Sequence, residues 1–393
     1  MNNKTIRTVK DFNLKGKRVL VRCDFNVPLN EKGEIEDDFR IKQTIPTIEY
    51  LIKKGAKVIL MSHLGEPEGK VVERLRLIPI QEKLREYLGF SVEKMSDCVG
   101  KEIEKQTLKM KEREVLLLEN LRFHREEKQN SQKFARELAK LGDVYVNDAF
   151  GVCHRNHTSI VRVSKFLPSA AGLLLEKEIK VLSKALENPW RPLVAIIGGV
   201  KIESKIGVIQ NLLEIADHVL IGGKIANAVL VVKGISVGMP WPSDETAEKI
   251  KKIKLTSTKL HLPIDAVISP DKSGEFYTRE AAPGKVRKDE KVLDIGPETI
   301  RIFSRIIESA KMIIWSGPLG YFEKPMFEKG TKEIAEKIAR NHQAFSIAGG
   351  GDTIFALNKF NLRDKFDHVS TGGGAMLSFL AKEEMPGIKV LEI

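Results

Sequence analysis

The sequence lacks any apolar run that approaches the ~18 residues of a membrane-spanning helix. Its first residues, MNNKTIRTVKDF, also lack the apolar core of a secretory signal peptide. Cysteine is scarce: Cys23, Cys98 and Cys153 are odd in number and share no metal-ligand spacing, which favours reduced thiols over a disulfide framework. These absences predict a cytoplasmic protein with no membrane partner.

No stretch of the chain clusters basic residues in a stripe with interleaved aromatics, as expected for a nucleic-acid-binding surface. The net charge is nevertheless +12 and the isoelectric point is near 9.3, which suggests anionic partners. Because 65 basic residues are interspersed with 53 acidic ones, anionic small molecules are as plausible as nucleic acid on charge alone. Since the basic stripe is lacking, we expect small-molecule substrates and no nucleic acid.

A chain of 393 residues exceeds what one hydrophobic core usually organises, so two domains are expected. Short β-rich runs alternate with longer runs of helical periodicity, and most of the β-rich runs are continuously apolar, as in strands that are covered on both faces. This pattern predicts βαβ units and parallel sheets. The expected strands are residues 18–23, 57–62, 114–119, 144–148, 193–197, 218–221, 265–269, 291–295, 312–316, 344–348 and 367–370.

Ligands of open α/β sheets collect at the carboxyl ends of the strands. In the first half of the chain, charged and hydrogen-bonding side chains follow the expected strands: Asp24, Asn26, His63, Arg122, Asn147, Asp148, His154 and Arg155. In the second half glycines follow them: Gly198, Gly199, Gly222, Gly223, Gly296, Gly317, Gly349, Gly350, Gly351, Gly372, Gly373 and Gly374. Arginines bind phosphate or carboxylate by side chain, and glycine loops before helices offer backbone N–H groups to phosphates. Two anion sites across a cleft therefore suggest phosphoryl transfer.

Lys201 and Lys205 lie four residues apart and are predicted to share a helix face directly after Gly198 and Gly199. A solvated lysine face is the commoner explanation of such a pair, but its position after a strand and a double glycine favours a phosphate site. Asp352 either caps a helix or, beside phosphates, binds Mg²⁺.

Eight stretches together resemble the phosphoglycerate kinase family in order and spacing: RVLVRCDFNVPL, SHLG, ENLRFH, VNDAFGVCHRNH, IIGGVKIESKIGVI, WSGPLGYFE, AGGGDT and HVSTGGGA. The resemblance implies an α/β fold of two Rossmann-like lobes with parallel sheets, joined by a hinge helix, with a C-terminal tail that returns to the N-terminal lobe. The corresponding boundaries are 1–170 with the tail 376–393, then 171–190 for the hinge helix and 191–375 for the nucleotide-binding lobe. The implied reaction is reversible phosphoryl transfer from 1,3-bisphosphoglycerate to ADP with Mg²⁺, which gives 3-phosphoglycerate and ATP in glycolysis or gluconeogenesis by a monomeric enzyme.

The resemblance also implies roles for individual residues. The substrate-binding residues would be Asp24, Phe25, Asn26, Arg40, His63, Leu64, Gly65, Glu66, Arg122 and Arg155. The nucleotide-binding residues would be Gly198, Gly199, Lys201, Lys205, Gly222, Gly223, Gly296, Pro318, Glu323, Gly350, Gly351, Asp352 and Thr353. Arg40, Lys205 and Lys201 would be catalytic, Asp352 would hold the metal ion, and Gly372, Gly373 and Gly374 would open an anion-binding helix. Because the acceptor carboxylate is already ionised at neutral pH, the reaction needs no general base.

The chain departs from the family pattern at both predicted pockets. Glu66 replaces an arginine, Lys224 replaces a glycine that lies against the adenine, and Val200, Ser204 and Ser316 also differ from the family. These changes leave an alternative open, in which the chain is a divergent paralogue that binds nucleotide or acidic ligands with little or no catalysis. Arg40, Lys205, Glu323 and Asp352 all match the family, which favours the enzyme.

Overall fold

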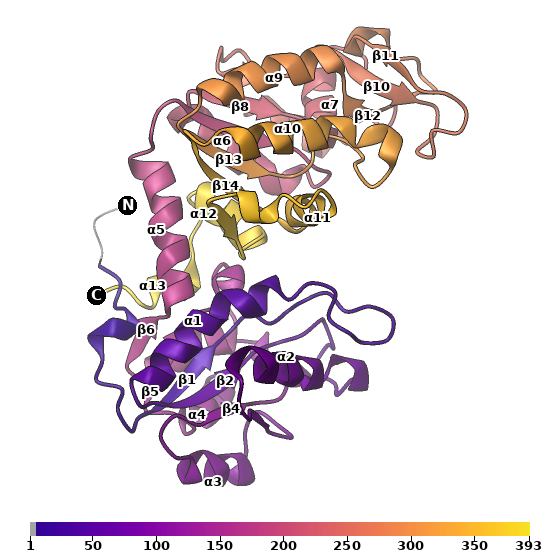
Figure 1. The fold of residues 1–393 in the computed structure, drawn as a ribbon. Helices are drawn as coiled ribbons and strands as arrows, with labels where there is room; N and C mark the ends of the chain where they lie inside the picture. The colour runs from indigo at the N-terminus through magenta and orange to yellow at the C-terminus, as the bar shows by residue number, and fades with distance from the viewer. Residues whose placement is uncertain (1–4) are drawn as a thin grey trace. The chain divides into compact units, whose positions relative to one another are not determined.

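The structure is a computed structural model, and it describes residues 5–393. The chain divides into two compact units: the first runs to Lys180 and also contains Glu384–Ile393, and the second is Val181–Glu383. The division falls within helix α5 (Leu173–Glu187). Figure 1 shows the elements of both units. None of the helices within residues 5–393 combines the length and apolarity needed to cross a membrane.

The first unit is built on a six-stranded parallel sheet in the order β3-β4-β2-β1-β5-β6. Its strands are β1 (Arg18–Arg22), β2 (Lys57–Met61), β3 (Glu93–Lys94), β4 (Val115–Leu117), β5 (Val144–Asn147) and β6 (Ser169–Ala171). Its helices are α1 (Phe39–Lys53), α2 (Ile78–Leu88), α3 (Lys101–Lys109), α4 (Gln132–Ala139), the first part of α5, and α13 (Pro386–Lys389).

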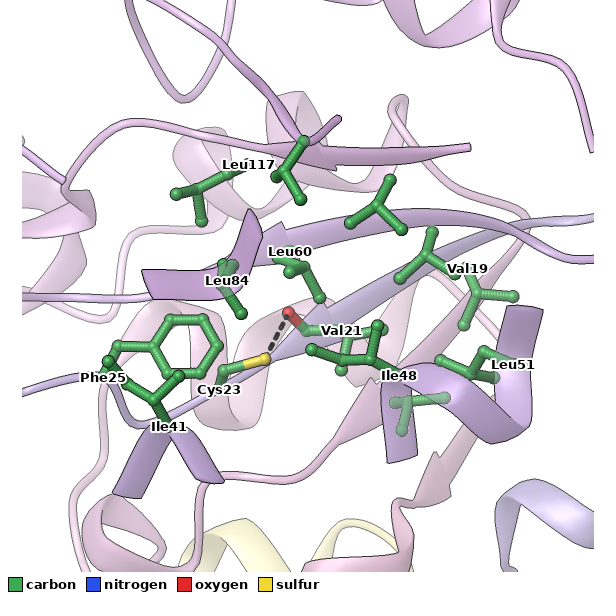
Figure 2. Close-up of a cluster of buried hydrophobic side chains, with 14 of the residues drawn as sticks. Val19, Val21, Cys23, Phe25, Ile41, Ile48, Leu51, Leu60, Leu84 and Leu117 are labelled. Carbon is green, nitrogen blue, oxygen red and sulfur yellow. Dashed lines mark hydrogen bonds between the residues drawn. The ribbon is translucent and has the colours of Figure 1, made fainter. Parts of the chain in front are cut away.

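Helices cover both faces of this sheet. Because successive strand residues point to opposite faces, neighbours along a strand belong to different cores. Val19 and Val21 pack with residues of α1 and α2, including Ile48 and Leu84, in the core that Figure 2 shows. Leu20 instead belongs to the core on the other face, which α3 and α4 cover with side chains such as Ile103, Phe134 and Leu138. This two-sided burial explains the continuously apolar strands of the sequence.

The second unit has its own six-stranded parallel sheet in the order β15-β14-β13-β7-β8-β9. Its strands are β7 (Leu193–Ile197), β8 (His218–Ile221), β9 (Leu260–His261), β13 (Met312–Ser316), β14 (Phe345–Gly349) and β15 (His368–Ser370). Its helices are the last part of α5, α6 (Glu203–Ile215), α7 (Gly223–Val232), α8 (Asp244–Lys251), α9 (Pro297–Ser309), α10 (Lys329–Arg340), α11 (Gly351–Lys359) and α12 (Gly374–Leu380). Phe303 of α9 and Ile334 of α10 pack with Ile313 and Trp315 of β13 in the core of one face.

The expected strands 265–269 and 291–295 do not join a parallel sheet. They form β10 (Ala266–Ser269) and β12 (Lys291–Ile295), which pair antiparallel with each other, and β10 also pairs antiparallel with β11 (Arg279–Ala281). Apolar runs identify strands but not their pairing partners, so the sequence pattern assigned these two to the wrong kind of sheet.

The C-terminal tail returns to the first unit, as the fold resemblance implied. Asn147 at the end of β5 donates from Nδ2 to the carbonyl oxygen of Gly387 over 3.2 Å. Gly387 has no room for a side chain, because a Cβ there would lie 2.6 Å from Ile160. The last residue, Ile393, donates its backbone N–H to the carbonyl oxygen of Thr5.

Candidate functional site

The predicted substrate residues of the first unit follow adjacent parallel strands at the same edge of the sheet. Asp24 and Asn26 follow β1, His63 follows β2, and Arg122 follows β4 in a short 3₁₀ turn (Leu121–Phe123). The order β4-β2-β1 makes these strands direct neighbours. The sheet topology therefore brings together residues that are far apart in the sequence.

Arg40 lies in the first turn of α1, where its guanidinium faces the loop after β1. Its Nη1 donates to the carbonyl oxygen of Asn26 over 3.0 Å and lies 3.1 Å from Oδ2 of Asp24. The side chain of Asn26 accepts in turn from the backbone N–H of Gly65 over 2.8 Å. These contacts hold a partly exposed guanidinium in a fixed position at the edge of the sheet.

Phe25 and Leu64 have fully buried side chains, so any contact with a ligand would come from their backbone. Their N–H groups are already used: Phe25 donates to Oγ of Ser62, and Leu64 donates to Oδ1 of Asn120. The structure thus gives both residues a supporting position beneath the charged side chains.

Glu66 forms an ion-pair cluster with Arg122 and Lys128. Oε1 of Glu66 lies 2.5 Å from Nη1 of Arg122, and Oε2 accepts a hydrogen bond from Nζ of Lys128. Burial acts to raise the pKa of Glu66, but the Lys128 hydrogen bond and the charges of Arg122, Lys128 and Arg155 outweigh it and lower that pKa. The sequence analysis named Arg122 and Arg155 but missed Lys128, which lies far from Glu66 along the chain.

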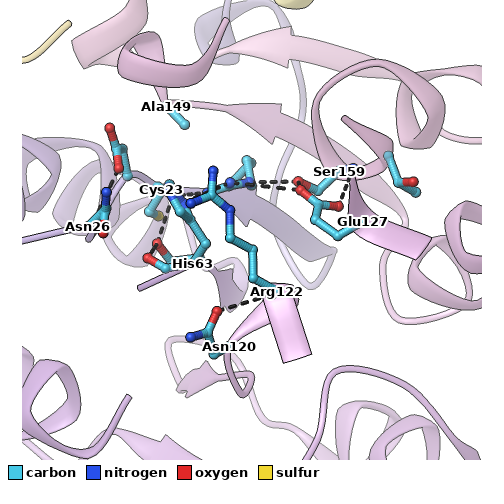
Figure 3. A network of polar contacts seen from close by, with 12 residues as sticks. Cys23, Asn26, His63, Asn120, Arg122, Glu127, Ala149 and Ser159 are labelled. Atoms are coloured by element: carbon cyan, nitrogen blue, oxygen red, sulfur yellow. Dashed lines mark hydrogen bonds and ion pairs between the residues drawn. The ribbon is translucent and has the colours of Figure 1, made fainter. Parts of the chain in front are cut away.

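A buried polar network that the sequence analysis did not predict joins the end of β1 to Ser159, Glu127 and His63, three residues that Figure 3 labels. Arg22, at the end of β1, is fully buried, and its Nε donates to Oγ of Ser159 over 2.7 Å. Ser159 in turn donates from Oγ to Glu127 over 2.6 Å, and the Glu127 carboxylate lies 4.0 Å from Nη2 of Arg22. Nη2 of Arg22 also lies 3.1 Å from Nδ1 of His63, which fixes the orientation of that ring.

The two histidines of this region are held neutral by their surroundings. Burial, followed by the charges of Arg22, Arg122 and Arg40, lowers the pKa of His63 well below its usual value. Burial and then Arg122, Arg22 and Arg155 lower the pKa of His157 to about 3. Burial is the larger cause of both shifts, and the arginine charges act in the same direction, so several cations lie close to both rings. Such a group of cations suits a multiply charged anion.

In the second unit, backbone approaches backbone at the ends of the central strands. A Cβ on Gly198 would lie 2.1 Å from the carbonyl oxygen of Pro318, and one on Gly223 would lie 2.7 Å from the nitrogen of Gly199. A Cβ on Gly222 would lie 2.4 Å from the side chain of Leu319. Only glycine fits these positions, so the glycines after β7 and β8 are explained first by packing.

Lys205 occupies the space that these glycines leave. Its Nζ donates to the carbonyl oxygen of Gly198 and lies 3.5 Å from that of Ser316. A Cβ on Gly199 would lie 2.8 Å from this Nζ. Burial lowers the pKa of Lys205 to about 8; the Asp352 charge opposes this shift and the Lys201 charge adds to it.

Lys201 and Lys205 do not share a helix face. Helix α6 begins at Glu203, so Lys201 precedes it and its side chain is exposed, whereas Lys205 is buried. The prediction of a common face was wrong because it placed the start of the helix too early. The two charges still act on each other, since Lys201 contributes to the lowered pKa of Lys205.

A cavity of about 200 Å³ opens in the second unit beside these glycines. Of the predicted nucleotide-binding residues, it is lined by Gly199, Gly223, Pro318, Glu323 and Asp352. It is also lined by Lys224 and Val200, the substituted positions, and by residues that the sequence analysis missed: Ala226, Asn227, Pro263, Lys272, Val292, Leu293, Asp294, Ile295, Leu319, Gly320 and Tyr321.

Helix α11 begins at Gly351, directly after β14, with Gly350 at its N-cap in a positive-φ conformation of 105°. Asp352 is exposed and lines the cavity, whereas Thr353 is buried. Oγ1 of Thr353 accepts from the N–H of Gly317 over 2.7 Å and donates to the carbonyl oxygen of Gly349 over 3.0 Å. The Thr353 hydroxyl therefore joins β13 to β14.

The remaining predicted glycines serve different local purposes. Gly296 caps α9, and a Cβ there would lie 2.3 Å from Asp265, whose carboxylate accepts from the first turn of that helix. Gly372 donates its N–H to Oγ of Ser370, and Gly373, at a φ of 48°, precedes the first residue of α12, Gly374. An anion site at Gly372, Gly373 and Gly374 stays a prediction.

Comparisons with known proteins agree over the full length of the chain. A family model described as phosphoglycerate kinase matches residues 9–383. The phosphoglycerate kinase of Dictyoglomus turgidum is 48% identical over 396 residues, covering 100% of each chain, and that of Borrelia garinii subsp. bavariensis is 49% identical over 393 residues, covering 99% of this chain and 100% of the other.

Solved structures show the same fold. The phosphoglycerate kinase from Coxiella burnetii aligns with a TM-score of 0.87 at 36% identity, covering 98% of this chain and 99% of that one. The enzyme from Pyrococcus horikoshii OT3 aligns with a TM-score of 0.85 at 33% identity, covering 98% of each chain. The fold, the glycine loops around a buried lysine and these relatives together define a phosphotransferase of two α/β units. The chain belongs to the phosphoglycerate kinase family. The alternative of a non-catalytic paralogue finds no support in these comparisons.

Proposed function

We propose that the cation-rich edge of the first unit binds 3-phosphoglycerate or 1,3-bisphosphoglycerate, and that the cavity of the second unit binds ADP or ATP. The observation that carries this assignment is the contrast between the two sites. Arg40 and Arg122 present guanidinium groups at the edge of the first sheet. The cavity of the second unit is lined by glycines and apolar side chains with a few polar groups, and the buried Lys205 lies beside its glycines. A substrate with both a phosphate and a carboxylate suits the first, and a nucleotide with an apolar base suits the second.

The transferred phosphoryl group requires positioning and neutralisation of charge more than it requires a proton donor or a nucleophilic side chain. We assign this role to Arg40 in the first unit and Lys205 in the second, with Lys201 near the phosphates. Arg40 is oriented by Asp24 and Asn26, and Lys205 by the carbonyl oxygen of Gly198. Each is therefore held in place at the carboxyl ends of the strands of its own unit, which limits reorganisation during transfer.

Asp352 is the residue that would hold Mg²⁺. It is exposed, it lines the cavity, and it follows directly on the glycine turn that starts α11. Among residues 5–393, no group of three His, Cys, Asp or Glu side chains gathers around it. This donor set fits Mg²⁺, which typically binds one or two carboxylates and completes its coordination with phosphate oxygens and water. When bound, the ion would neutralise charge on the nucleotide phosphates.

Glu323 and Lys224 lie on the nucleotide cavity, and we assign Glu323 to the ribose hydroxyls. A carboxylate accepts from two vicinal hydroxyl groups, which makes it suited to a sugar. The monomeric state, the cytoplasmic location and the place in glycolysis or gluconeogenesis stay proposals.

A coupled assay for the ATP-dependent consumption of 3-phosphoglycerate tests the assignment. Activity is expected for the unaltered chain, and Arg40→Met and Lys205→Met should each reduce kcat by at least 100-fold, because each removes a charge that acts on the transferred group. Lys105→Met, on the exposed face of α3, is the matched control and should keep full activity. An inactive chain with intact folding, or active Arg40→Met and Lys205→Met variants, would contradict the proposal.

A further inference from the structure

The Glu66 carboxylate places a negative charge of the protein itself at the sheet edge that we assigned above to an anionic substrate. The Glu66 carboxylate bridges two cations, with Oε1 at Nη1 of Arg122 and Oε2 at Nζ of Lys128. Its side chain is 52% exposed, so it covers this edge from the solvent side. Arg122, in contrast, is 3% exposed.

Arg122 is not fully satisfied by its partners. Nη1 donates to the carbonyl oxygen of Gly65 over 2.8 Å and to Glu66, but Nε is buried and has no hydrogen-bond partner. Buried polar groups of native proteins usually find a partner, and leaving one without a partner costs free energy. The Arg122 guanidinium therefore has an N–H group that the Glu66 carboxylate leaves without an acceptor. An anion with more oxygen atoms than a carboxylate could accept a hydrogen bond from it.

The backbone around Glu66 is held, and its side chain is the adjustable part. Asn26 accepts from the N–H of Gly65, and Asn120 holds both the N–H and the carbonyl oxygen of Leu64. Gly65 has a φ of 63° and lies directly over Leu75, where a Cβ would be 2.8 Å from Cδ2. Glu66 can thus turn outward by rotation about its side-chain bonds without movement of the main chain.

Several charged groups act on Arg122. Burial lowers its pKa most, the Glu66 charge opposes this, Arg22 and Arg155 lower the pKa further, and Glu127 raises it. Arg155 also acts on Glu66. A phosphate carries up to two negative charges and three terminal oxygens, so it satisfies two or three cations better than a carboxylate does.

We propose that the Glu66 carboxylate occupies the phosphate site formed by Arg122 and Lys128, that the substrate phosphate binds there by displacing it, and that Lys128 is thereby a further substrate-binding residue. This inference rests on the proposed function, because it takes the substrate to be phosphoglycerate. Glu66 acts as a competing internal anion that weakens binding, and Lys128 supplies the cation that the family pattern places at position 66. Arg76, further along the chain, is instead paired with Glu73 and Glu119.

The test is a double-mutant cycle on the full chain with 3-phosphoglycerate as the probe, measured by calorimetry and by KM. Glu66→Gln keeps the shape of the side chain and removes its charge, so the Kd for 3-phosphoglycerate should fall about tenfold. Lys128→Met should raise that Kd about tenfold when it is made in the Glu66→Gln background, where no carboxylate remains for Lys128 to hold. Lys105→Met is the matched lysine control, and the KM for ATP should stay unchanged in every variant.

Each outcome decides a separate point. An unchanged or higher Kd in Glu66→Gln overturns the displacement. An unchanged Kd on adding Lys128→Met to Glu66→Gln overturns the role of Lys128 and reduces it to a partner of Glu66. Failure of the proposed function is distinguishable from both, because the unaltered chain would then neither bind 3-phosphoglycerate nor consume ATP with it.

Discussion

The ammonium group of Lys205 donates a hydrogen bond to the carbonyl oxygen of Gly198, directly after β7. The side chain is 7% exposed, and burial lowers its pKa to about 8. The group assigned to neutralise the transferred phosphoryl thus loses its proton much closer to neutral pH than an ordinary lysine does, although it is still mostly charged at pH 7. Such a group responds strongly to a bound anion, because an opposite charge nearby favours its charged form.

Nucleotide binding should therefore be coupled to proton uptake. The phosphates raise the pKa of Lys205 above about 8, so at pH 8.5 the complex holds more protons than the free chain, and affinity for ADP falls as pH rises from 8. Calorimetry in buffers of different ionisation enthalpy measures this uptake. Lys205→Met should abolish it and Lys201→Met should keep it; equal uptake in all three would contradict the assignment of Lys205.

The parallel sheets were predictable because their central strands are continuously apolar and covered on both faces. Three successive residues of β1 are all buried: Val19 and Val21 on one face of the sheet and Leu20 on the other. A strand buried on both faces appears in the sequence as a continuous apolar run. The short strands β3, β6 and β9 were not predicted, because two or three residues form no pattern. The antiparallel pairing of β10 with β12 was missed because register depends on tertiary packing.

The sequence predicted that glycines follow the strands of the second unit, but not the packing that requires a glycine at each position. Gly198 and Gly223 are required by backbone packing, which only the three-dimensional structure reveals. The contact of Glu66 with Lys128 was also beyond the sequence, since the loop after β2 meets the turn after β4 only in the folded sheet.

Lys224 is predicted to weaken discrimination among purine bases. It is exposed and lines the nucleotide cavity in the first turn of α7, where the family has a glycine against the adenine. We expect its stem to cover the base while its ammonium turns to the solvent, so contacts specific to adenine should be reduced and ATP should still be accepted. The ratio of kcat/KM for ATP over GTP should rise in Lys224→Gly. A strong preference for ATP that Lys224→Gly leaves unaltered would contradict this.

The buried network of Arg22, Ser159 and Glu127 is predicted to be essential for the stability of the first unit. Glu127→Gln removes the negative charge nearest to the fully buried Arg22, and loss of one partner of a buried ion pair costs about 3 kcal/mol or more. Denaturant unfolding monitored on the first unit measures this loss. Glu126→Gln changes the exposed neighbour in the same turn and should shift the unfolding free energy by no more than about 0.5 kcal/mol. Equal effects of the two variants would show that the network does not stabilise Arg22.

The ion pair of His124 with Asp97 makes the last prediction, which concerns stability as a function of pH. Nε2 of His124 lies 2.6 Å from Oδ1 of Asp97. The hydrogen bond with Asp97 raises the pKa of His124 against the opposing effect of burial. For Asp97, burial acts to raise the pKa, but the hydrogen bonds from His124 and the N–H of Cys98 lower it overall.

The signs of the two shifts define a pH window. Because the folded pKa of His124 is raised, its contribution is fully present below its unfolded value of about 6.5 and is lost as pH rises through the folded pKa. Because the folded pKa of Asp97 is lowered, its contribution is present above about 3.9 and is lost as pH falls. The pair therefore stabilises the first unit most between about pH 4 and 6.5. Since Asp97 is half exposed, the gain is no more than about 1 kcal/mol.

His124→Gln should accordingly destabilise the chain more at pH 5.5 than at pH 8.5. His124 also stacks on Phe134, with ring centroids 4.9 Å apart, and loss of that packing lowers stability equally at both pH values. The difference between the two pH values therefore isolates the ion pair, and it is measured by denaturant unfolding of both proteins at both pH values. Asp97→Asn should remove the same pH-dependent part while keeping the stacking on Phe134. A destabilisation by His124→Gln that is equal at pH 5.5 and 8.5 would show that the pair carries no net charge interaction.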